Sequence, residues 1–404
     1  MIQLKLVLLS ITEQDGDNMK KRKIQYLLLS AAVLLCGCSQ QQEESRGTFP
    51  EGVEMSTEAT AKPAESIEIT ATTTLALTTP PETEKGSAVI AFAGDTTQSD
   101  VFAEATSWRS MAYPFEDVAD IFKGADISFV NLETCVSDRG ESEKKEGLGF
   151  RTEPEYLQVY TEAGIDIVSC ANNHVRDFGM EALGDTFMNL TDYGIDYIGA
   201  GNNITEAEKL VTYEVNGLTL GFTACNMINM NPTWYANDER AGLNCVDFAA
   251  SEEYLSLISE YDRKCDVLFV SVHWGVEYSN AITEEQEQFA HLLCDNGADI
   301  ILGHHPHVLQ PIESYNDSMI FYSLGNFLFY KMDDYAGMTA IFEIEADKNG
   351  FVSGRLSPVF ISNCKSNLLD TDDEMYGEII ELCRSISEPY GVNITPDGGI
   401  EPIR

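Results

Sequence analysis

Basic side chains are scarce in this 404-residue chain. Lys and Arg number 25 against 66 Asp and Glu, so the formal net charge is −41 at neutral pH. Such an acidic surface repels nucleic acid, which is therefore not expected as a partner. An anionic substrate would need a local cationic feature, and a bound metal ion can supply one.

Paired cysteine motifs are also missing. The chain has 10 cysteines, but none forms a Cys-x-x-Cys pair of the kind that binds zinc or supports redox chemistry. Several lie inside apolar runs, as buried free cysteines do. We expect the cysteines that follow Cys38 to be mostly reduced core residues.

A full-length membrane span is lacking at the amino terminus, where the pattern is typical of an export signal. A basic cluster at 20–23 precedes a short apolar run at 26–35, and Leu-Cys-Gly-Cys38 follows directly. This ending resembles a bacterial lipobox, which implies that residues 1–37 are a signal peptide and that Cys38 is lipidated. An uncleaved anchor is the alternative, and either way the remainder lies outside the cytoplasmic membrane. Met19 is the expected true start of the protein, and the alternative is that residues 1–18 extend the amino-terminal region of the signal peptide.

Apolar side chains are sparse between residues 39 and 86. Thr, Glu, Ala, Ser and Pro dominate this segment, and Phe49 is its only aromatic residue. Too little apolar surface is available to offset the entropy of ordering the chain. We expect residues 38–86 to be a lipidated cysteine followed by a solvated linker, although 67–77 could form an irregular strand.

Alternating strand-like and helical runs from residue 87 predict an α/β domain over 87–363. The segment 364–404 is acidic and weakly periodic, and we interpret it as a peripheral appendage with one helix near 378–385. The strands are expected at 88–93, 127–130, 165–169, 197–199, 218–224, 267–272, 300–302, 320–322 and 339–345. The helices are expected at 114–122, 154–163, 180–193, 252–261 and 283–296.

Short polar clusters close many of these apolar runs and contain five of the six histidines. The carboxyl ends of strands in an open α/β sheet project into one crevice, so these separate clusters can meet in space. The clusters are Gly94-Asp95, Asn131-Leu132-Glu133, Asn172-Asn173-His174, His273-Trp274-Gly275 and Gly303-His304-His305-Pro306-His307.

The residue types in these clusters suit a divalent transition metal. Imidazoles with carboxylates favour Zn, Mn or Fe, whereas Ca²⁺ prefers an all-oxygen shell. His305 and His307 are two residues apart across a proline, which lets both rings converge on one cavity. Asp95 and Glu133 can supply anionic ligands, with Glu133 able to bridge two ions. His174 can be either a ligand or an acid.

Other positions have two interpretations each. Asp177 can orient His174 or cap the following helix. His304 can replace His305 as a ligand or donate a hydrogen bond to a ligand residue. Trp274 and Glu277 can line a substrate pocket, although a Trp is often a core residue. His291, inside a predicted helix, serves as a control that we expect on the surface with no role.

The clusters resemble the CapA family of capsule and poly-γ-glutamate biosynthesis proteins, whose domain is similar to calcineurin-like metallophosphoesterases. The matching segments run in family order over about 89–329 and also include Tyr322-Ser323-Leu324-Gly325-Asn326-Phe327. The resemblance implies an αββα sandwich of two sheets with the site at the strand ends. It implies metal residues Asp95, Glu133, Asn173, His273, His305 and His307, with His174 as the acid beside them. We also predict that Asp177 is a catalytic residue and that a substrate pocket contains Trp274, Glu277, His304 and Asn326.

One departure bears on the number of metal ions. Metallophosphoesterases usually begin with Asp-x-His, whereas this chain has Asp95-Thr96-Thr97 and so lacks one imidazole. One or two ions therefore remain open.

We expect a lipid-anchored extracytoplasmic protein that acts in capsule or poly-γ-glutamate synthesis or export, with a metal-dependent hydrolase-type site. Its substrate would be an anionic polymer or a phosphoester, and polyglutamate synthase subunits are the expected partners. The alternatives are a non-catalytic polymer-binding component of a capsule assembly complex, and a secreted metallophosphoesterase.

Overall fold

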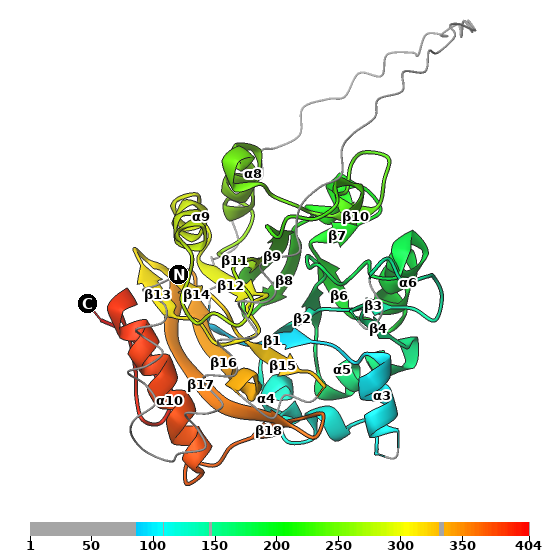
Figure 1. The fold of residues 1–404 in the computed structure, drawn as a ribbon. Coiled ribbons are helices and arrows are strands. Elements are labelled where there is room, and N and C mark those ends of the chain that lie inside the picture. The colour runs from blue at the N-terminus through cyan, green and yellow to red at the C-terminus, as the bar shows by residue number, and fades with distance from the viewer. Residues whose placement is uncertain (1–85, 108, 145–147, 331–334, 404) are drawn as a thin grey trace, which may run out of the picture. The chain divides into compact units, whose positions relative to one another are not determined.

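Two β-sheets pack face to face in the part of the chain that the computed structural model describes, residues 86–107, 109–144, 148–330 and 335–403 (Figure 1). These residues all belong to one unit, Thr79–Arg404. The predicted signal peptide, Cys38 and the linker up to residue 85 lie outside the described residues. None of the described helices is long and apolar enough to cross a membrane.

The first sheet has ten strands among the described residues. Its centre is parallel, because β1, β2, β5 and β6 run in one direction and β15 runs parallel to β1. β16 and β17 continue the sheet in antiparallel fashion. The spatial order is β19 (Val392–Ile394), β20 (Gly399–Pro402), β17 (Gly350–Ser362), β16 (Met338–Asp347), β1 (Ala88–Thr96), β2 (Ile127–Leu132), β5 (Ile167–Ser169) and β6 (Asp196–Ile198), with β15 (Asn326–Leu328) beside β1 and β18 (Lys365–Leu368) beside β17.

The second sheet has six strands in the described part of the chain. Its four central strands, β9, β11, β12 and β14, are parallel, and antiparallel strands close both edges. The spatial order is β13 (Ile312–Tyr315), β14 (Ser318–Phe321), β12 (Ile300–His304), β11 (Val267–His273), β9 (Leu218–Asn226) and β8 (Val211–Val215). Two short pairs lie apart, β3 (Cys135–Val136) with β4 (Arg151–Thr152) and β7 (Ala200–Gly201) with β10 (Gly242–Leu243).

Apolar side chains fill the space between the sheets. Phe92 of β1 contacts Phe321 of the second sheet edge-on, with ring centroids 4.9 Å apart, and stacks on Phe342 of β16 at 5.7 Å. The neighbours Ala91 and Ala93 point to the opposite face, as strand alternation requires. Both faces of β1 are buried, which is why its sequence is a continuous apolar run.

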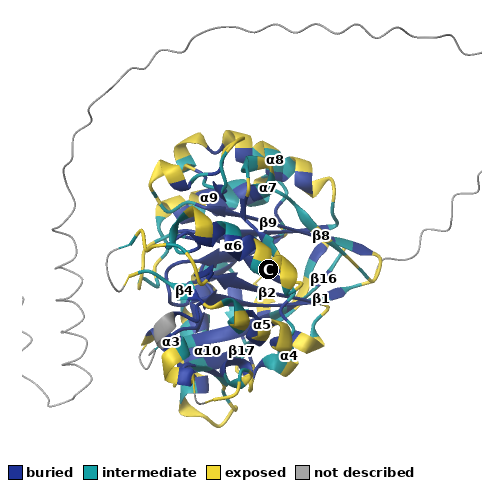
Figure 2. Cartoon of the chain, turned by 90° about the vertical axis from the view of Figure 1, so that its right-hand side faces the viewer, coloured by how far each residue is buried: buried dark blue, intermediate teal, exposed yellow. Residues whose placement is uncertain are grey.

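Helices cover the outer face of each sheet, which completes the predicted αββα sandwich. Two further cores show this arrangement, one joining α4, α5 and α6 to the first sheet and the other joining α8 and α9 to the second. Figure 2 shows the buried strands between these helices, whose outer faces are exposed. The helices are α3 (Asp100–Thr106), α4 (Ala119–Gly124), α5 (Leu157–Ala163), α6 (Gly179–Asp192), α7 (Ile204–Ala207), α8 (Glu252–Asp262), α9 (Glu284–Asp295) and α10 (Glu374–Ser387).

Helix ends follow local chemistry. Thr283 and Gln286 form a reciprocal capping box at the start of α9, and Gly164 ends α5 in the left-handed conformation. Every predicted strand overlaps an observed one. The predicted helix 114–122 is instead a 3₁₀ turn at Tyr113–Phe115 and the short α4.

The segment 364–404 is part of the sandwich in the structure, which corrects its interpretation as a peripheral appendage. β18 pairs with β17, and β19 and β20 extend the first sheet. One face of α10 packs into the core between the sheets through Tyr376, Ile379, Ile380 and Cys383. The strands were missed because they are short and half-buried, which leaves little periodicity in the sequence.

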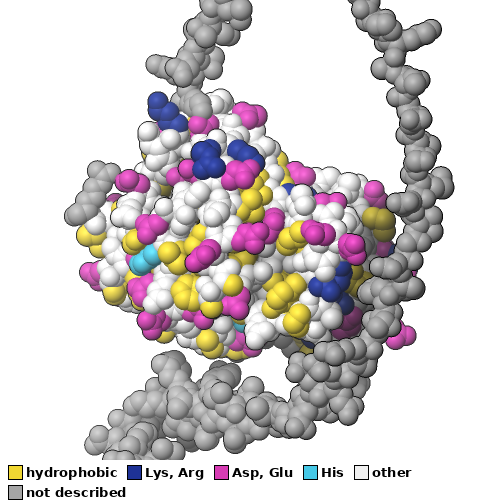
Figure 3. All heavy atoms as spheres, turned by 90° about the horizontal axis from the view of Figure 1, so that it is seen from above, with side chains coloured by type: hydrophobic (Ala, Val, Ile, Leu, Met, Phe, Trp, Pro, Cys, Tyr) yellow, Lys and Arg dark blue, Asp and Glu magenta, His cyan; other side chains and the backbone are white. Residues whose placement is uncertain are grey.

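The cysteines behave as expected. All eight in the described part of the chain are free, and five of them are buried. Figure 3 shows acidic side chains spread over one face of the molecule, with basic side chains gathered in only a few places.

Candidate metal centre

Polar side chains from both sheets meet at the carboxyl ends of their parallel strands. Asp95 of β1 lies beside Asn131 of β2, and Glu133 follows β2 directly. His273 and His304 end β11 and β12 and are neighbours in register. Packing of the sheets joins the two sets, because His304 Nδ1 lies 3.2 Å from Asp95 Oδ1.

Glu133, His305 and His307 bring their ligand atoms closest together. One such atom from each residue lies within 4.8 Å of the other two, and all three residues are buried. Glu133 Oε1 also lies 3.7 Å from His273 Nε2 and 3.9 Å from His174 Nε2. The structure thus brings the two imidazoles of the His-Pro-His segment together as their spacing predicted, and their role as ligands stays a prediction.

Asp95 orients the segment 304–307, the histidine loop. Its Oδ1 accepts a hydrogen bond from Asn131 Nδ2 at 2.8 Å, and its Oδ2 accepts one from the His305 backbone N–H at 3.3 Å. His307 Nδ1 lies 3.2 Å from Asp95 Oδ2 and 2.9 Å from Asn326 Oδ1. With Nδ1 held in this way, Nε2 of His307 faces Glu133.

The histidine loop has a strained backbone. His305 and His307 have φ angles of 96° and 59°, in the left-handed region that residues with a Cβ seldom adopt. Such strain costs on the order of 1–3 kcal/mol per residue and concentrates at functional sites. The surrounding hydrogen bonds hold the two rings in place against this cost.

Two glycines let backbones approach closely beside the site. A Cβ on Gly94 would lie 1.9 Å from the carbonyl oxygen of Gly325, and one on Gly303 would lie 2.0 Å from that of Tyr322. Any side chain at these positions would push the strand ends apart. The Gly-Asp and Gly-His steps are therefore needed for Asp95 and His304 to reach each other.

His174 is fixed by Asp177. Its Nδ1 lies 2.6 Å from Asp177 Oδ2, which also accepts the Phe150 backbone N–H at 2.8 Å. The Phe150 ring stacks on the imidazole with centroids 4.2 Å apart. Helix α6 begins without a side-chain cap. Of the two interpretations of Asp177, the structure supports orientation of His174.

The buried carboxyls and imidazoles shift one another's pKa values. Burial, with the nearby charge of Asp95, raises the pKa of Glu133 well above its usual range. Burial lowers the pKa of His305 to about 4. Burial also opposes protonation of His307, but the carboxylates of Glu133 and Asp95 outweigh it and raise that pKa to about 9. Mixed pKa shifts of this kind cluster at functional sites.

The unpartnered atoms fit a bound cation. Among the described residues, both carboxyl oxygens of Glu133, Nδ1 of His273 and His305, and Nε2 of His304 have no hydrogen-bond partner although they are buried. Buried polar atoms rarely stay unsatisfied, and a cation held by Glu133, His305 and His307 would give the Glu133 carboxylate a partner. Imidazole and carboxylate donors together favour Zn, Mn or Fe.

Trp274 does not line a pocket, which corrects that prediction. It is buried beneath the second sheet, stacks on Tyr322 at 5.9 Å and donates its indole N–H to the Tyr322 carbonyl at 2.8 Å. The reason is strand alternation: His273 faces the site, so the next side chain faces the other way. Glu277 is exposed, and its charge acts on Glu133 and His307 from the rim.

The control residue also differs from expectation. His291 is 27% exposed rather than free on the surface, and its Nε2 lies 3.0 Å from Glu313 Oε1. Its ring stacks on Tyr315 with centroids 3.8 Å apart. These contacts support a structural role for His291.

Several site residues were missed from the sequence. Asn172 donates from Nδ2 to Asn131 Oδ1 at 3.1 Å and accepts the His174 backbone N–H. Phe150 supports His174, and Lys144 Nζ lies 3.5 Å from Asp177 Oδ1. The two asparagines belong to recognised clusters and could have been included, whereas nothing in the sequence near Phe150 or Lys144 marks them.

The fold and the cluster define a two-sheet α/β protein with a candidate metal centre at its strand ends. Residues 89–331 match the family described as "Bacterial capsule synthesis protein PGA_cap", and the chain belongs to this family. It is 32% identical over 275 residues to the "PGA biosynthesis protein CapA" of Bacillus subtilis, covering 67% of this chain and 70% of that protein. It is 34% identical over 224 residues to the "Capsule biosynthesis protein CapA" of Bacillus anthracis, covering 54% of each chain.

Two solved structures show a distant likeness. A phosphatase from Mycoplasma pneumoniae is 14% identical with a TM-score of 0.44, covering 68% of this chain and 94% of that one. The NAD nucleotidase of Haemophilus influenzae is 10% identical with a TM-score of 0.38, covering 75% of this chain and 64% of that one. The two-sheet sandwich itself rests on the strand order and packing described above.

Proposed function

We propose that this chain is a lipid-anchored extracytoplasmic protein that acts in the synthesis or export of a capsule polymer of the poly-γ-glutamate type through a metal-dependent hydrolase-type site. Family membership supports the pathway. The observation that carries the chemistry is the buried group of Glu133, His305 and His307, whose ligand atoms converge while both carboxyl oxygens of Glu133 and Nδ1 of His305 have no hydrogen-bond partner.

Residues of both sheets would hold the metal. Besides Glu133, His305 and His307, these are Asp95, Asn173 and His273. A bound Mn, Zn or Fe ion supplies Lewis acidity. One or two ions are compatible with this set of donors.

His174 is the proposed proton donor to the leaving group. Asp177 occupies Nδ1, so Nε2 is the atom that faces the cluster, 3.9 Å from Glu133 Oε1. A positioned imidazole of this kind acts as general acid and base. Phe150 stacks on the ring and limits its rotation.

The reaction is hydrolysis or transfer at an anionic substrate, either a phosphoester or a γ-glutamyl amide. The polymer pathway favours the amide, with polyglutamate synthase subunits as partners.

Cys38 is the proposed lipid attachment point. Replacing Cys38 with Ser should release the protein from membranes, and continued membrane association would instead favour an uncleaved anchor.

Metal removal and return test the site. We would strip the purified protein with a chelator, add back Mn, Zn or Fe, and measure bound metal together with turnover of phosphoesters and γ-glutamyl amides. Stoichiometric metal and turnover that is lost and regained with it are the expected results. A folded protein that binds no metal after supplementation would contradict the hydrolase site and favour a non-catalytic polymer-binding component.

A further inference from the structure

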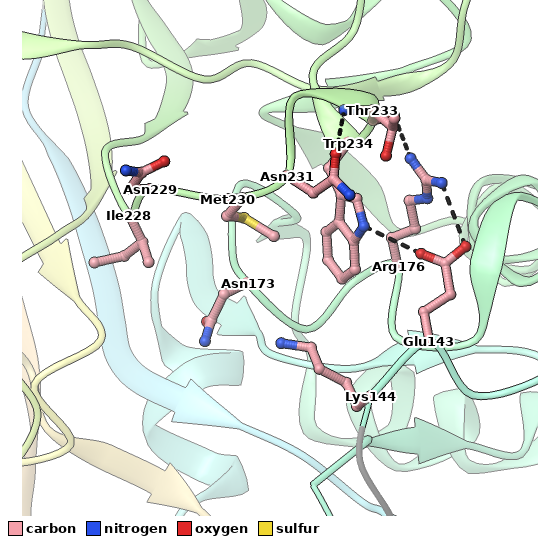
Figure 4. A pocket seen from close by; sticks show the side chains of 10 residues that line it. All are labelled: Glu143, Lys144, Asn173, Arg176, Ile228, Asn229, Met230, Asn231, Thr233 and Trp234. Atoms are coloured by element: carbon pink, nitrogen blue, oxygen red, sulfur yellow. Dashed lines mark hydrogen bonds and ion pairs between the residues drawn. The ribbon is translucent and has the colours of Figure 1, made fainter. Parts of the chain in front are cut away.

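A pocket of about 530 Å³ adjoins the candidate metal centre (Figure 4). Its volume falls in the range of roughly 300–1,000 Å³ typical of small-molecule sites. Asn173 belongs to both places, since it lines the pocket and its Oδ1 lies 2.8 Å from His273 Nε2. The other lining residues are Glu143, Lys144, Arg176, Ile228, Asn229, Met230, Asn231, Thr233 and Trp234.

The lining is cationic in a chain of net charge −41. It has two basic side chains, Lys144 and Arg176, against the single carboxylate of Glu143. Arg176 Nη2 lies 3.3 Å from Glu143 Oε1, so these two charges offset each other, and Glu143 Oε2 also accepts the Trp234 indole N–H at 3.1 Å. Lys144 Nζ also has a carboxylate nearby, 3.5 Å away at Asp177 Oδ1, but its ammonium has three donors and so keeps donors for a ligand.

Lys144 is placed to bind a ligand beside the reacting groups. Figure 4 shows its ammonium pointing across the pocket toward Asn173. Its side chain is 28% exposed, and Nζ lies 3.5 Å from Asp177 Oδ1, the carboxylate that orients His174. A ligand anion held by Lys144 would thus lie next to the proposed proton donor.

We propose that this pocket binds a carboxylate-bearing unit of the substrate, a γ-linked glutamyl residue, adjacent to the bond that is cleaved. This inference rests on the proposed function. Such a unit combines one carboxylate, one amide and a short apolar stem. The pocket offers a matching ammonium, asparagine side chains, and the apolar surfaces of Ile228, Met230 and Trp234.

Because the Lys144 ammonium already lies beside the Asp177 carboxylate, a singly charged carboxylate is easier to hold there than a phosphate, which carries nearly two negative charges. Arg176 cannot bind the same ligand anion as Lys144 unless it leaves its partner Glu143. Arg176 instead holds the pocket wall, because its Nη1 also donates to the Thr233 carbonyl.

Calorimetric titration of the full-length protein tests the proposal. The metal is stripped first, so that a bound metal ion cannot also bind the anionic probe. The probes are a short γ-linked glutamate oligomer and the same oligomer with its carboxylates amidated. We expect Lys144→Gln to weaken binding of the anionic oligomer at least about tenfold, the loss of one charge-assisted hydrogen bond. Lys144→Arg should restore most of the affinity, and the amidated oligomer should bind weakly to every variant.

Lys348→Gln is the matched control, because Lys348 is exposed in the turn between β16 and β17. Equal binding by the Lys144→Gln and Lys348→Gln variants, or no binding by the wild type, would overturn the assignment. A competition titration with inorganic phosphate is the second check. If phosphate displaces the oligomer at equal concentration, and does so only when Lys144 is present, the pocket is a phosphate site instead.

Bound metal and turnover of the metal-loaded wild type separate this inference from the proposed function. Loss of oligomer binding with metal-dependent turnover intact overturns the pocket alone. If the protein takes up no metal but binds the oligomer in a Lys144-dependent way, the pocket assignment is supported and the hydrolase function is contradicted.

Discussion

The two sheets make different chemical contributions to the candidate centre. The first sheet and its loops supply oxygen atoms, from Asp95, Glu133 and Asn173. The second sheet supplies the imidazoles of His273 and of the loop that begins at His304. Apart from His174, which follows β5 and is the proposed proton donor, each sheet offers one kind of donor, so the mixed donor set exists only when the sandwich is assembled.

This division links metal binding to folding. A ligand that binds only the folded state stabilises it according to its concentration and affinity. A cation held by oxygen atoms from one sheet and nitrogen atoms from the other would in addition fasten the two layers together. Changes in either donor set should therefore alter both metal retention and the response of stability to metal.

The largest effect is expected from removing the second sheet's donors. The His305→Ala/His307→Ala variant should retain no metal after gel filtration, because two converging imidazoles are lost. Mass spectrometry of bound metal measures this, and melting should no longer respond to added metal. His291→Gln is the matched control, since His291 lies on α9, which packs against the same sheet, and pairs with Glu313. Equal losses in both variants would contradict the assignment.

A large effect on turnover alone is expected at Asp177. An amide there should let His174 turn or change tautomer, and a positioned acid or base is worth roughly 10²–10⁴ in rate. Asp177→Asn should thus lower kcat by about a hundredfold, leave metal content unchanged and alter the pH profile. Asp192→Asn, at the exposed end of α6, is the control. Loss of metal together with turnover would make Asp177 part of the metal shell instead.

A smaller effect on metal affinity is expected from the first sheet. Glu133→Gln keeps the shape and one carbonyl oxygen but removes the charge, so affinity should fall roughly tenfold to a hundredfold, the range found when groups around a metal site are altered. Metal titration of the stripped protein measures it. Glu313→Gln replaces a buried glutamate of the second sheet and should leave affinity unchanged. An unchanged affinity in Glu133→Gln would break the comparison between the sheets.

The strand-end residues were predictable for a physical reason. Asp95 and His304 each end an apolar run, and such runs are strands whose carboxyl ends share a crevice. The same reasoning failed for Trp274, because adjacency to His273 was given more weight than the alternation of strand side chains. The neighbour of a site residue on a strand belongs to the opposite face.

The pocket and the carboxyl-terminal strands could not be predicted. Lys144 and Trp234 come from separate loops, and no periodicity or spacing connects them; only the folded chain places them on one cavity. β19 and β20 are three and four residues long and partly exposed, so their pattern is weak. The sequence indicates a helix near 378–385 within a segment interpreted as peripheral, whereas the buried face of α10 includes Tyr376, Ile379 and Ile380.

The smallest expected effect is on the pH dependence of stability, at the end of the second sheet that lies away from the candidate metal centre. Asp299 precedes β12, and burial raises its pKa to about 6, with a contribution from Asp262. The folded state therefore favours the protonated carboxyl, so its contribution to stability is present at low pH and is lost as pH rises from about 4 through 6. Between pH 5 and pH 7 the loss should be about 1 kcal/mol.

Asp299→Asn removes this titration while its side-chain oxygen can still accept the Leu268 backbone N–H, a bond that is 2.7 Å long in the wild type. The difference in unfolding free energy between wild type and variant should therefore change by about 1 kcal/mol over that pH range, with the variant favoured at pH 7. Urea unfolding at several pH values measures it. Metal content should not change, because this carboxylate lies at the other end of the strand from His304. Metal loss here would show that second-sheet oxygen atoms also support the centre, and the division of donors between the sheets would then be incomplete.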